Sequence, residues 1–459
     1  MSERLGFSGL AGFLIALSAC GDDGTGGSGN SGGAGGSGAG HSTGATGGGG
    51  SSGDGGSTGG AGVGGTGVGG SGGGTVETCL GSNLLADLNV NHLMVGVATF
   101  EPTTAAEPFD LQYRYLSGGY ADGDGPCDSC ATGCTASGQN CSNAGGGCSW
   151  WGCWQYDQDP PGAYVRSFVT DTLANGQIPM ITYYEILQAS GVAEGSPEVV
   201  VMNDAAFLRR FFNDVRFLLQ QIGNNPAIFH PEPDFWGYAE QMNPDPHAIP
   251  AAVQSANPTD CAGEENSIAG LGRCLVTMTH KYAPNAKIGL HGSPWATNYD
   301  VVQNSDPGFD VAGHAAQLGT FLSACGPDAD LVIIDGSDRD AGYDQANGQD
   351  TWWDATNQSL PNFHQAFAWS SALSVAMGKP NLWWQLPVGN SNLPDVPNQW
   401  KDNRVEYFMA HMDEVAAAHG VGAAFGAGQG DQTSAETDGG LLISLVQSYD
   451  ASGGEPLCP

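Results

Sequence analysis

Short apolar runs alternate along the chain with longer stretches of helical periodicity. The clearest helical stripe begins after Asp204, the expected cap, and ends at Gly223. Other helices are expected at 163–175, 266–282, 311–324, 361–377, 402–419 and 438–449. The strand-like runs are 92–100, 109–116, 178–187, 227–234, 287–295, 330–338, 381–390 and 421–428. Most are apolar on both faces, which is typical of a parallel sheet covered by helices. Eight such units predict an α/β fold, a (β/α)8 TIM-type barrel, with an open doubly wound sheet as the alternative.

The N-terminal part of the chain has a different composition. Residues 1–19 have the apolar stretch and small residues of a secretory signal, too short to span a membrane. The sequence Leu17-Ser18-Ala19-Cys20 resembles the lipobox of bacterial lipoproteins, which implies cleavage before Cys20 and a lipid on its thiol; an ordinary signal peptide is the alternative. Residues 20–75 are Gly- and Ser-rich and predict a flexible linker. We therefore expect an exported, membrane-anchored lipoprotein whose barrel domain covers 76–459.

Charge restricts the ligands that this domain can bind. The formal net charge is −35, from 13 basic and 48 acidic residues. Such a surface repels nucleic acid and other anionic polymers, so a neutral ligand is expected. Apart from the lipid, no membrane contact is predicted, and we expect a monomer.

The cysteines agree with an oxidising compartment. Six of them lie close together and are expected to make three disulfides within one inserted loop: Cys127, Cys130, Cys134, Cys141, Cys148 and Cys153. Cys261 with Cys274 and Cys79 with Cys458 are further expected pairs, which leaves Cys325 free.

The segment IFHPEPDFWGY (228–238) carries the first candidate chemistry. In an extended strand His230, Glu232 and Asp234 point to one face, and the two prolines indicate that strand pairing ends here. Carboxylates at the C-terminal rim of a barrel suit hydrolysis of sugars. Glu232 is the expected general acid, with Asp234 or His230 tuning its pKa. The alternative is that the two carboxylates cap a helix or bond to loop amides.

A second carboxylate is expected after the sixth strand, in DLVIIDGSDRD (330–340). Asp335 directly follows the apolar run and is the expected base or nucleophile, although Asp-Gly is also a turn former. Asp335, Asp338 and Asp340 together could hold a structural Ca²⁺ ion, but their spacing is not that of a known calcium loop. We expect no required cofactor and no catalytic metal.

Other residues at the predicted rim are expected to contact the substrate. Aromatic side chains that could carry sugar rings are Trp151, Trp236, Tyr238, Trp295 and Trp384, and the expected polar contacts are Tyr184, Glu185, His230, His291, Asp338, Gln385 and Asn390.

A barrel with Glu232 at the end of its fourth strand resembles the broad class of (β/α)8 glycoside hydrolases. HPEPDFWGY is also similar, in its Glu-Pro-Asp core, to a strand motif of the family 6 cellulases. The resemblance implies hydrolysis of a neutral polysaccharide, a β-glucan or similar, by carboxylate acid and base catalysis. The seventh strand has Gln385 where retaining members with paired Glu have a Glu, so a non-catalytic carbohydrate-binding lipoprotein is one alternative. A metal-dependent hydrolase using His230, Glu232, His291 and the Asp335 cluster is the other.

Overall fold

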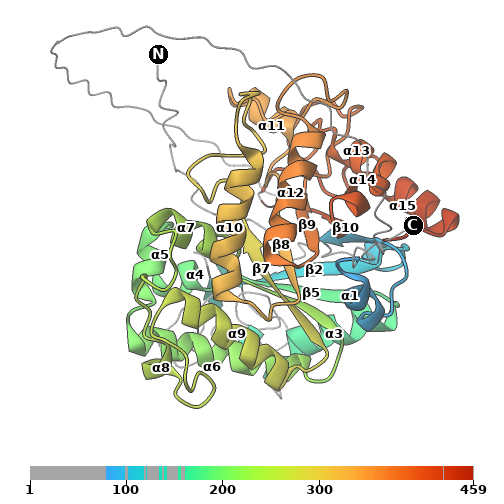
Figure 1. The fold of residues 1–459 in the computed structure, drawn as a ribbon. Coiled ribbons are helices and arrows are strands. Elements are labelled where there is room, and N and C mark those ends of the chain that lie inside the picture. The colour runs from blue at the N-terminus through green and yellow to red at the C-terminus, as the bar shows by residue number, and fades with distance from the viewer. Residues whose placement is uncertain are drawn as a thin grey trace, which may run out of the picture. The chain divides into compact units, whose positions relative to one another are not determined.

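Eight parallel strands form a closed barrel in the computed structural model of the protein (Figure 1). The structure describes residues 79–98, 102–117, 120, 134–136, 139–141, 154–156, 161–426, 428 and 430–457. The barrel strands are β1 Met94–Ala98, β2 Leu111–Leu116, β5 Ile178–Tyr183, β6 Ala227–Pro231, β7 Ala286–Gly292, β8 Leu331–Ile334, β9 Asn381–Leu386 and β10 Gly420–Phe425. Neighbours in the barrel follow chain order, and β10 closes it by pairing with β1. The predicted TIM-type fold is confirmed, and each strand-like run overlaps one barrel strand, with β7 and β10 beginning one residue before the predicted run.

Helices surround the barrel, as the periodicity predicted. They are α1 Ser82–Asp87, α2 Pro102–Ala105, α3 Ala163–Ala174, α4 Ile186–Ser190, α5 Ser196–Val201, α6 Ala205–Ile222, α7 Pro233–Met242, α8 Val253–Ala256, α9 Ile268–Tyr282, α10 Val311–Cys325, α11 Ala341–Ala346, α12 Phe363–Met377, α13 Arg404–Ala410, α14 Met412–Ala417 and α15 Leu441–Ser452. Asp204 caps α6 by accepting hydrogen bonds from the amides of Ala206 (2.8 Å) and Phe207 (3.3 Å). The single helix expected at 402–419 is instead two helices, because the backbone of His411 leaves the helical conformation (φ −134°).

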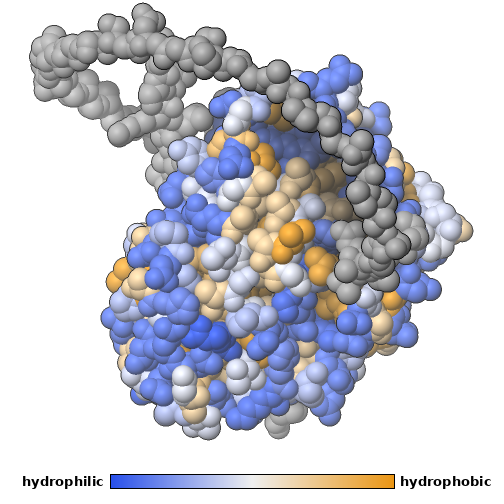
Figure 2. All heavy atoms as spheres, in the orientation of Figure 1, coloured by the Kyte–Doolittle hydropathy of each residue, from blue (hydrophilic) through white to orange (hydrophobic). Residues whose placement is uncertain are grey.

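Two apolar clusters make the core. One lies between the strands and the surrounding helices and includes most of the stripe of α6. The other fills the barrel interior, where Leu84 and Leu85 of α1 pack with Met94, Ile178 and other strand residues. Asp87 at the end of α1 forms an ion pair with Lys287 near the start of β7, so α1 lies at the N-terminal end of the barrel. On the face shown in Figure 2, the surface over α6, α8 and α9 is mostly hydrophilic, whereas a more apolar strip follows α10 and α12.

Several predictions concern residues outside the described part of the chain. These are the signal peptide, the lipidation of Cys20 and the linker. In the cysteine-rich insertion, the short strands β3 Cys134–Ala136 and β4 Gln139–Cys141 pair in antiparallel fashion. The side chains of the six clustered cysteines are not described, so their three disulfides stay a prediction. Within the described residues, no helix combines the length and the apolar character that crossing a membrane requires.

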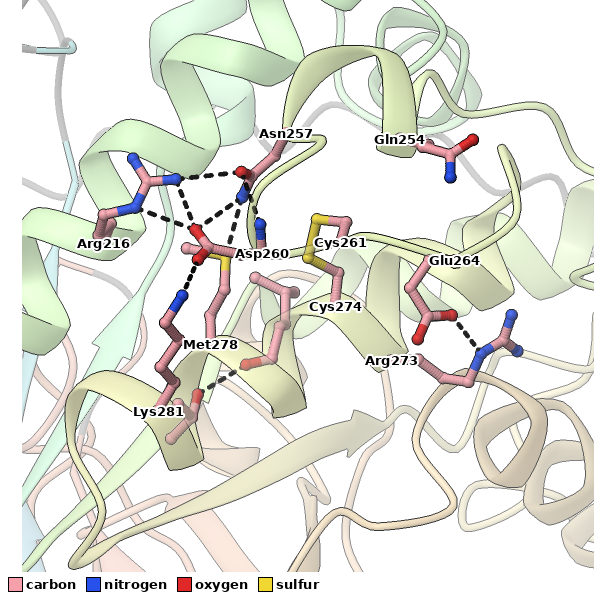
Figure 3. The surroundings of a disulfide bond; sticks show 12 residues. Arg216, Gln254, Asn257, Asp260, Cys261, Glu264, Arg273, Cys274, Met278 and Lys281 are labelled. Atoms are coloured by element: carbon pink, nitrogen blue, oxygen red, sulfur yellow. Dashed lines mark hydrogen bonds and ion pairs between the residues drawn. A yellow bond between two sulfur atoms is a disulfide. The ribbon is translucent and has the colours of Figure 1, made fainter.

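Cys261 and Cys274 form the predicted disulfide, and Cys325 is buried and free, as expected. Cys79 is disulfide-bonded, and Cys458, its expected partner, lies outside the described residues. Figure 3 shows a polar cluster next to the Cys261–Cys274 bond. There the buried carboxylate of Asp260 accepts hydrogen bonds from Arg216 Nη2 (2.6 Å) and Lys281 Nζ (2.7 Å). Burial alone would raise the pKa of Asp260, but Lys281, Arg216 and Tyr282 outweigh it and hold the pKa well below its usual range.

We expect Asp260→Asn to lower the free energy of unfolding at pH 7 by about 1–3 kcal/mol, because it replaces a buried carboxylate that accepts charge-assisted hydrogen bonds from Arg216 and Lys281. A depressed folded-state pKa contributes stability above the unfolded value of about 3.9 and loses it as the pH falls further. Denaturant titrations at pH 7 and pH 3 should therefore show a smaller difference from wild type at pH 3. Asp306→Asn, in an exposed turn, is the control; an Asp260→Asn deficit that is equal at both pH values would contradict the ionic role.

Candidate functional site

Carboxylates from separate loops gather at the C-terminal ends of the barrel strands. Asp335 directly follows β8 and Asp338 lies in the same loop, while Asp234 comes from the first turn of α7, after β6. All three side chains are partly exposed. Each of them raises the pKa of the buried phenol of Tyr115 from β2, so the three carboxylates lie within electrostatic range of one side chain at the rim. The predicted Asp335, Asp338 and Asp234 are therefore brought together.

The local structure of the Glu-Pro-Asp segment differs from the extended strand that the sequence predicted. Strand β6 ends at Pro231, and Glu232 adopts a left-handed backbone conformation (φ 51°, ψ 70°). Pro233, which has no amide proton to leave unsatisfied, then starts α7. His230, Glu232 and Asp234 consequently do not share one strand face. A left-handed backbone costs free energy for a residue other than glycine, and such strain is typical of functional sites.

The carboxylate of Glu232 points toward the chain that follows β5. It accepts hydrogen bonds from the backbone amides of Glu185 (3.0 Å) and Ile186 (3.2 Å), at the start of α4. Burial raises the pKa of Glu232, and the two amides oppose this rise. The side chain is only 1% exposed. This is the arrangement of the alternative prediction, in which the carboxylate bonds to loop amides.

Asp234 has the surroundings of a carboxyl group that holds its proton. Burial raises its pKa well above the usual range, and the carboxylates of Asp335, Glu194 and Glu198 raise it further. Glu194 is itself held in place by the hydroxyl of Tyr238, which donates to its Oε1 (2.7 Å). A partly exposed acid with a raised pKa, next to other carboxylates, is the environment in which enzymes keep a general acid protonated.

A chain of buried polar side chains reaches Asp335 across four consecutive strands. His291 Nε2 lies 3.2 Å from Asp335 Oδ1, and His291 Nδ1 lies 3.1 Å from His230 Nε2. His230 Nδ1 in turn lies 3.3 Å from Thr182 Oγ1. Both imidazoles meet the indole of Trp384 edge to face, with ring centroids 4.7 Å and 5.6 Å away. His230 and His291 were predicted substrate contacts, but they are 0% and 1% exposed and lie beneath the site.

Gln385 occupies the end of β9 in another strained conformation (φ 57°). Its Oε1 accepts a hydrogen bond from the hydroxyl of Tyr115, whose pKa burial raises well above the usual value, so that the phenol stays a donor. Gly428, in the loop after β10, passes so close that a Cβ there would lie 1.5 Å from Gln385 Nε2. The side chain of Gln385 is thus held by Tyr115 on one side and by the backbone at Gly428 on the other. It lies in the same region of the rim as Asp234, Asp335 and Asp338.

We expect Gly428→Ala to displace Gln385 and to weaken binding of the neutral saccharide that the sequence predicts as ligand by about tenfold or more, because the new methyl group takes the place of the Gln385 amide. Isothermal titration with an oligosaccharide would measure the change. Gly308→Ala, in an exposed turn where the nearest atom to a new Cβ is Asp306 Oδ1 at 3.3 Å, is the control. Equal affinities for both variants would show that Gln385 does not contact the ligand.

Two of the predicted aromatic contacts lie together at the rim. Tyr238 and Trp295 are partly exposed, and their ring centroids are 4.9 Å apart. The prediction that Trp236 contacts the substrate does not fit the structure, because its side chain is fully buried. Its Nε1 donates to the carbonyl of Pro231 (3.0 Å), which stabilises the turn into α7. Trp384 is also buried and packs inside the barrel. Trp151 lies outside the described residues.

Three predicted polar contacts with the substrate are buried side chains instead. Glu185 accepts a hydrogen bond from Trp154 Nε1 (3.4 Å), and Asn390 donates from Nδ2 to the carbonyl of Asp438 (2.7 Å). Tyr184 packs in the interior cluster. These contacts organise the loops that carry the site.

The three aspartates of DGSDRD do not converge on one point. Asp340 turns away from Asp335 and accepts hydrogen bonds from the amides of Gly389 (2.9 Å) and Thr433 (2.7 Å), which ties the loops after β8, β9 and β10 together. Within the described part of the chain, no group of three or more His, Cys, Asp or Glu side chains could hold a metal ion.

Sequence reasoning missed three residues of this site. Tyr115, Thr182 and Glu194 all lie close to predicted residues, but each belongs to a residue type that is common in cores and loops. Tyr115 and Thr182 do occupy the alternate positions of β2 and β5 that face the barrel interior, together with Tyr113 and Met180. That alternation was the available signal.

The fold and the site define the class of protein: a (β/α)8 barrel with carboxylates at the C-terminal face, where the active sites of such barrels lie. No family model matches the sequence, and no curated protein sequence is significantly similar. Among solved structures, an endo-β-1,4-mannanase of glycoside hydrolase family 26 from Cellulomonas fimi matches over 82% of this chain and 74% of its own, with 11% identity and a TM-score of 0.45. A family 5 mannosidase from Rhizomucor miehei matches over 78% and 92%, with 9% identity and a TM-score of 0.41. The endoglucanase Cel6 from Mycobacterium tuberculosis matches over 52% of this chain and 62% of its own, with 14% identity and a TM-score of 0.26. With scores this low, the barrel assignment stands on the strand topology itself.

Proposed function

We propose that this protein is a glycoside hydrolase that cleaves a neutral polysaccharide with Asp234 as general acid and Asp335 as the second carboxylate. The observation that carries the proposal is the pair itself: a partly exposed Asp234 with a raised pKa lies within electrostatic reach of Asp335 at the C-terminal face. Two carboxyl groups of which one is protonated are what glycosidic bond hydrolysis requires. Glu232, the acid expected from sequence, is nearly inaccessible and bonds to two amides, which favours a positioning role.

In this mechanism the Asp234 carboxyl protonates the leaving glycosidic oxygen. Asp335 either activates a water molecule or attacks the anomeric carbon, and its proximity favours the proton staying on Asp234 until transfer. Tyr238 and Trp295 offer ring surface for a sugar, and Gln385 offers a fixed amide. The surrounding carboxylates Glu194 and Asp338 would repel an anionic glycan, which agrees with the net charge of −35. These features favour an uncharged polymer, such as a β-glucan or a mannan.

We further propose that the chain is exported and tethered by a lipid on Cys20, with residues 20–75 as a linker, and that it acts as a monomer. The lipobox-like sequence and the glycine-rich composition support this proposal. Such a tether would hold the barrel close to a membrane while leaving it access to extended polymers.

A non-catalytic carbohydrate-binding protein is the second candidate, because Gln385 stands where a paired Glu would lie. The test is release of reducing ends from neutral glucans, xylans and mannans by the full-length protein, with and without a chelator. Cleavage of one polymer that the chelator leaves unchanged supports the proposed hydrolase. Binding without any new reducing ends would favour the non-catalytic candidate, and loss of activity with chelator would favour a metal-dependent one.

A further inference from the structure

The hydrogen bonds that join Thr182, His230, His291 and Asp335 beneath the site can all run the same way, each group donating to the next one toward Asp335. His230 is buried among strand residues, and burial lowers its pKa well below the usual value, so that the ring is neutral. A neutral imidazole has one N–H donor and one acceptor nitrogen. Each of its two hydrogen bonds must therefore run in a defined direction.

Asp335 sets that direction. An ionised carboxylate only accepts, so His291 donates from Nε2 to Asp335 Oδ1. His230 Nδ1 accepts from the hydroxyl of Thr182, and His230 donates from Nε2 to Nδ1 of His291. This arrangement gives each of these side chains a hydrogen-bond partner and leaves both rings uncharged. The opposite direction would make His291 donate from both nitrogens, as a cation paired with Asp335.

The strand register builds this arrangement. Thr182 and His230 are direct partners across β5 and β6. His291 lies on β7 and Asp335 just beyond β8, so that one polar position on each of four neighbouring strands makes a row. The indole of Trp384 meets both imidazoles edge to face and shields them.

We propose that Thr182, His230 and His291 are positioning residues, which hold the carboxylate of Asp335 in a fixed orientation through a directed hydrogen-bond relay. The inference rests on the proposed function, because it assigns a role to Asp335. A hydrogen bond from a neutral N–H to a carboxylate favours the charged form. The titratable groups around Asp335 are His291, Asp234, Asp300, Asp338 and Tyr115.

The tautomers of the two histidines test the relay without any assay of activity. In the full-length protein labelled with ¹⁵N-histidine, long-range ¹H–¹⁵N spectra at pH 7 should show the proton of both His230 and His291 on Nε2. Thr182→Val should then shift the Nδ1 resonance of His230, because its donor is lost. Thr279→Val is the matched control, since that buried hydroxyl bonds to the carbonyl of Leu275 in α9. A proton on Nδ1 of His291, or on both of its nitrogens, would overturn the relay.

The pH dependence of catalysis gives a second readout. His291→Phe keeps a ring beside Trp384 but removes the donor, and we expect the acidic limb of the kcat/KM profile to move up by about one to two pH units. His291→Gln, which retains an N–H donor and an acceptor, should restore most of the wild-type profile. A His291→Phe profile with unchanged shape and reduced height would indicate packing alone and contradict the inference. If the wild-type protein shows the predicted tautomers but cleaves no glycan, the relay is supported and the proposed function is contradicted.

Discussion

Asp234→Asn is expected to lower kcat on the polymer by about 10²–10⁴-fold, the contribution that general acid catalysis typically makes. The amide has the size of the carboxyl group but has no proton to give to the leaving oxygen. Affinity should change little, because the lost interaction forms only in the transition state. Initial rates of reducing-end release and calorimetric binding to the same oligosaccharide would separate the two effects.

The same variant should be more stable than wild type at neutral pH. The folded-state pKa of Asp234 is raised, so its contribution to stability is full below the unfolded value and is lost as the pH rises through the folded value. An amide cannot ionise and avoids that loss, so the Tm difference between variant and wild type should grow from pH 4 to pH 8. A more stable but inactive variant is the usual signature of a strained catalytic group.

Glu232→Gln is the matched comparison. Its amide oxygen can still accept from the backbone amides of Glu185 and Ile186. Because burial raises the pKa of Glu232 as well, the variant avoids the cost of a buried charge, so we expect a free energy of unfolding at pH 7 no lower than that of wild type and a kcat within about tenfold of wild type. If Glu232→Gln instead lost the activity with unchanged stability, while Asp234→Asn remained active, the acid would be Glu232.

Asp335→Ala is expected to lower kcat by at least about 10³-fold, because it removes the second carboxylate of the proposed mechanism. Sodium azide should then restore part of the rate, since a small anion can enter the space left by the carboxylate. Product analysis of the rescued reaction would show whether azide ends up on the anomeric carbon and, by its stereochemistry, how Asp335 acts.

Asp330→Ala is the control for this prediction, because Asp330 precedes β8 and thus lies at the opposite end of the same strand. Its carboxylate accepts a hydrogen bond from the amide of Ile288 (2.9 Å). Substitutions at the N-terminal face of a barrel affect stability rather than catalysis. We expect Asp330→Ala to lower the Tm and to leave kcat unchanged, with no response to azide. A similar loss of kcat in both variants would show that Asp335 is needed for the fold only.

Periodicity predicted the barrel, with an open doubly wound sheet as the alternative. Apolar runs such as 330–338 and 421–428 are typical of strands buried on both faces, and the stripe of α6 begins at the predicted cap. The carboxyl ends of parallel strands meet at one face, so Asp335 and Asp234 could also be placed near each other from sequence.

The roles of individual side chains could not be predicted in the same way. Strand alternation assigned Glu232 to the site, but the left-handed turn at that residue sends its carboxylate to the start of α4 and moves Asp234 onto a helix. Backbone conformations of this kind depend on tertiary contacts rather than on local preference. Likewise, Trp236 has the sequence context of a sugar platform, yet its indole is used inside the turn.

The dependence of rate on the leaving group tests the central claim, that Asp234 donates the proton, most directly. Aryl glycosides of the sugar released from the cleaved polymer would be compared in wild type and Asp234→Asn. A leaving group as acidic as dinitrophenol needs no proton, so the variant should hydrolyse that substrate at close to the wild-type rate and fail on substrates with poor leaving groups. An Asp234→Asn variant that is equally impaired on all leaving groups, or on none, would contradict the account.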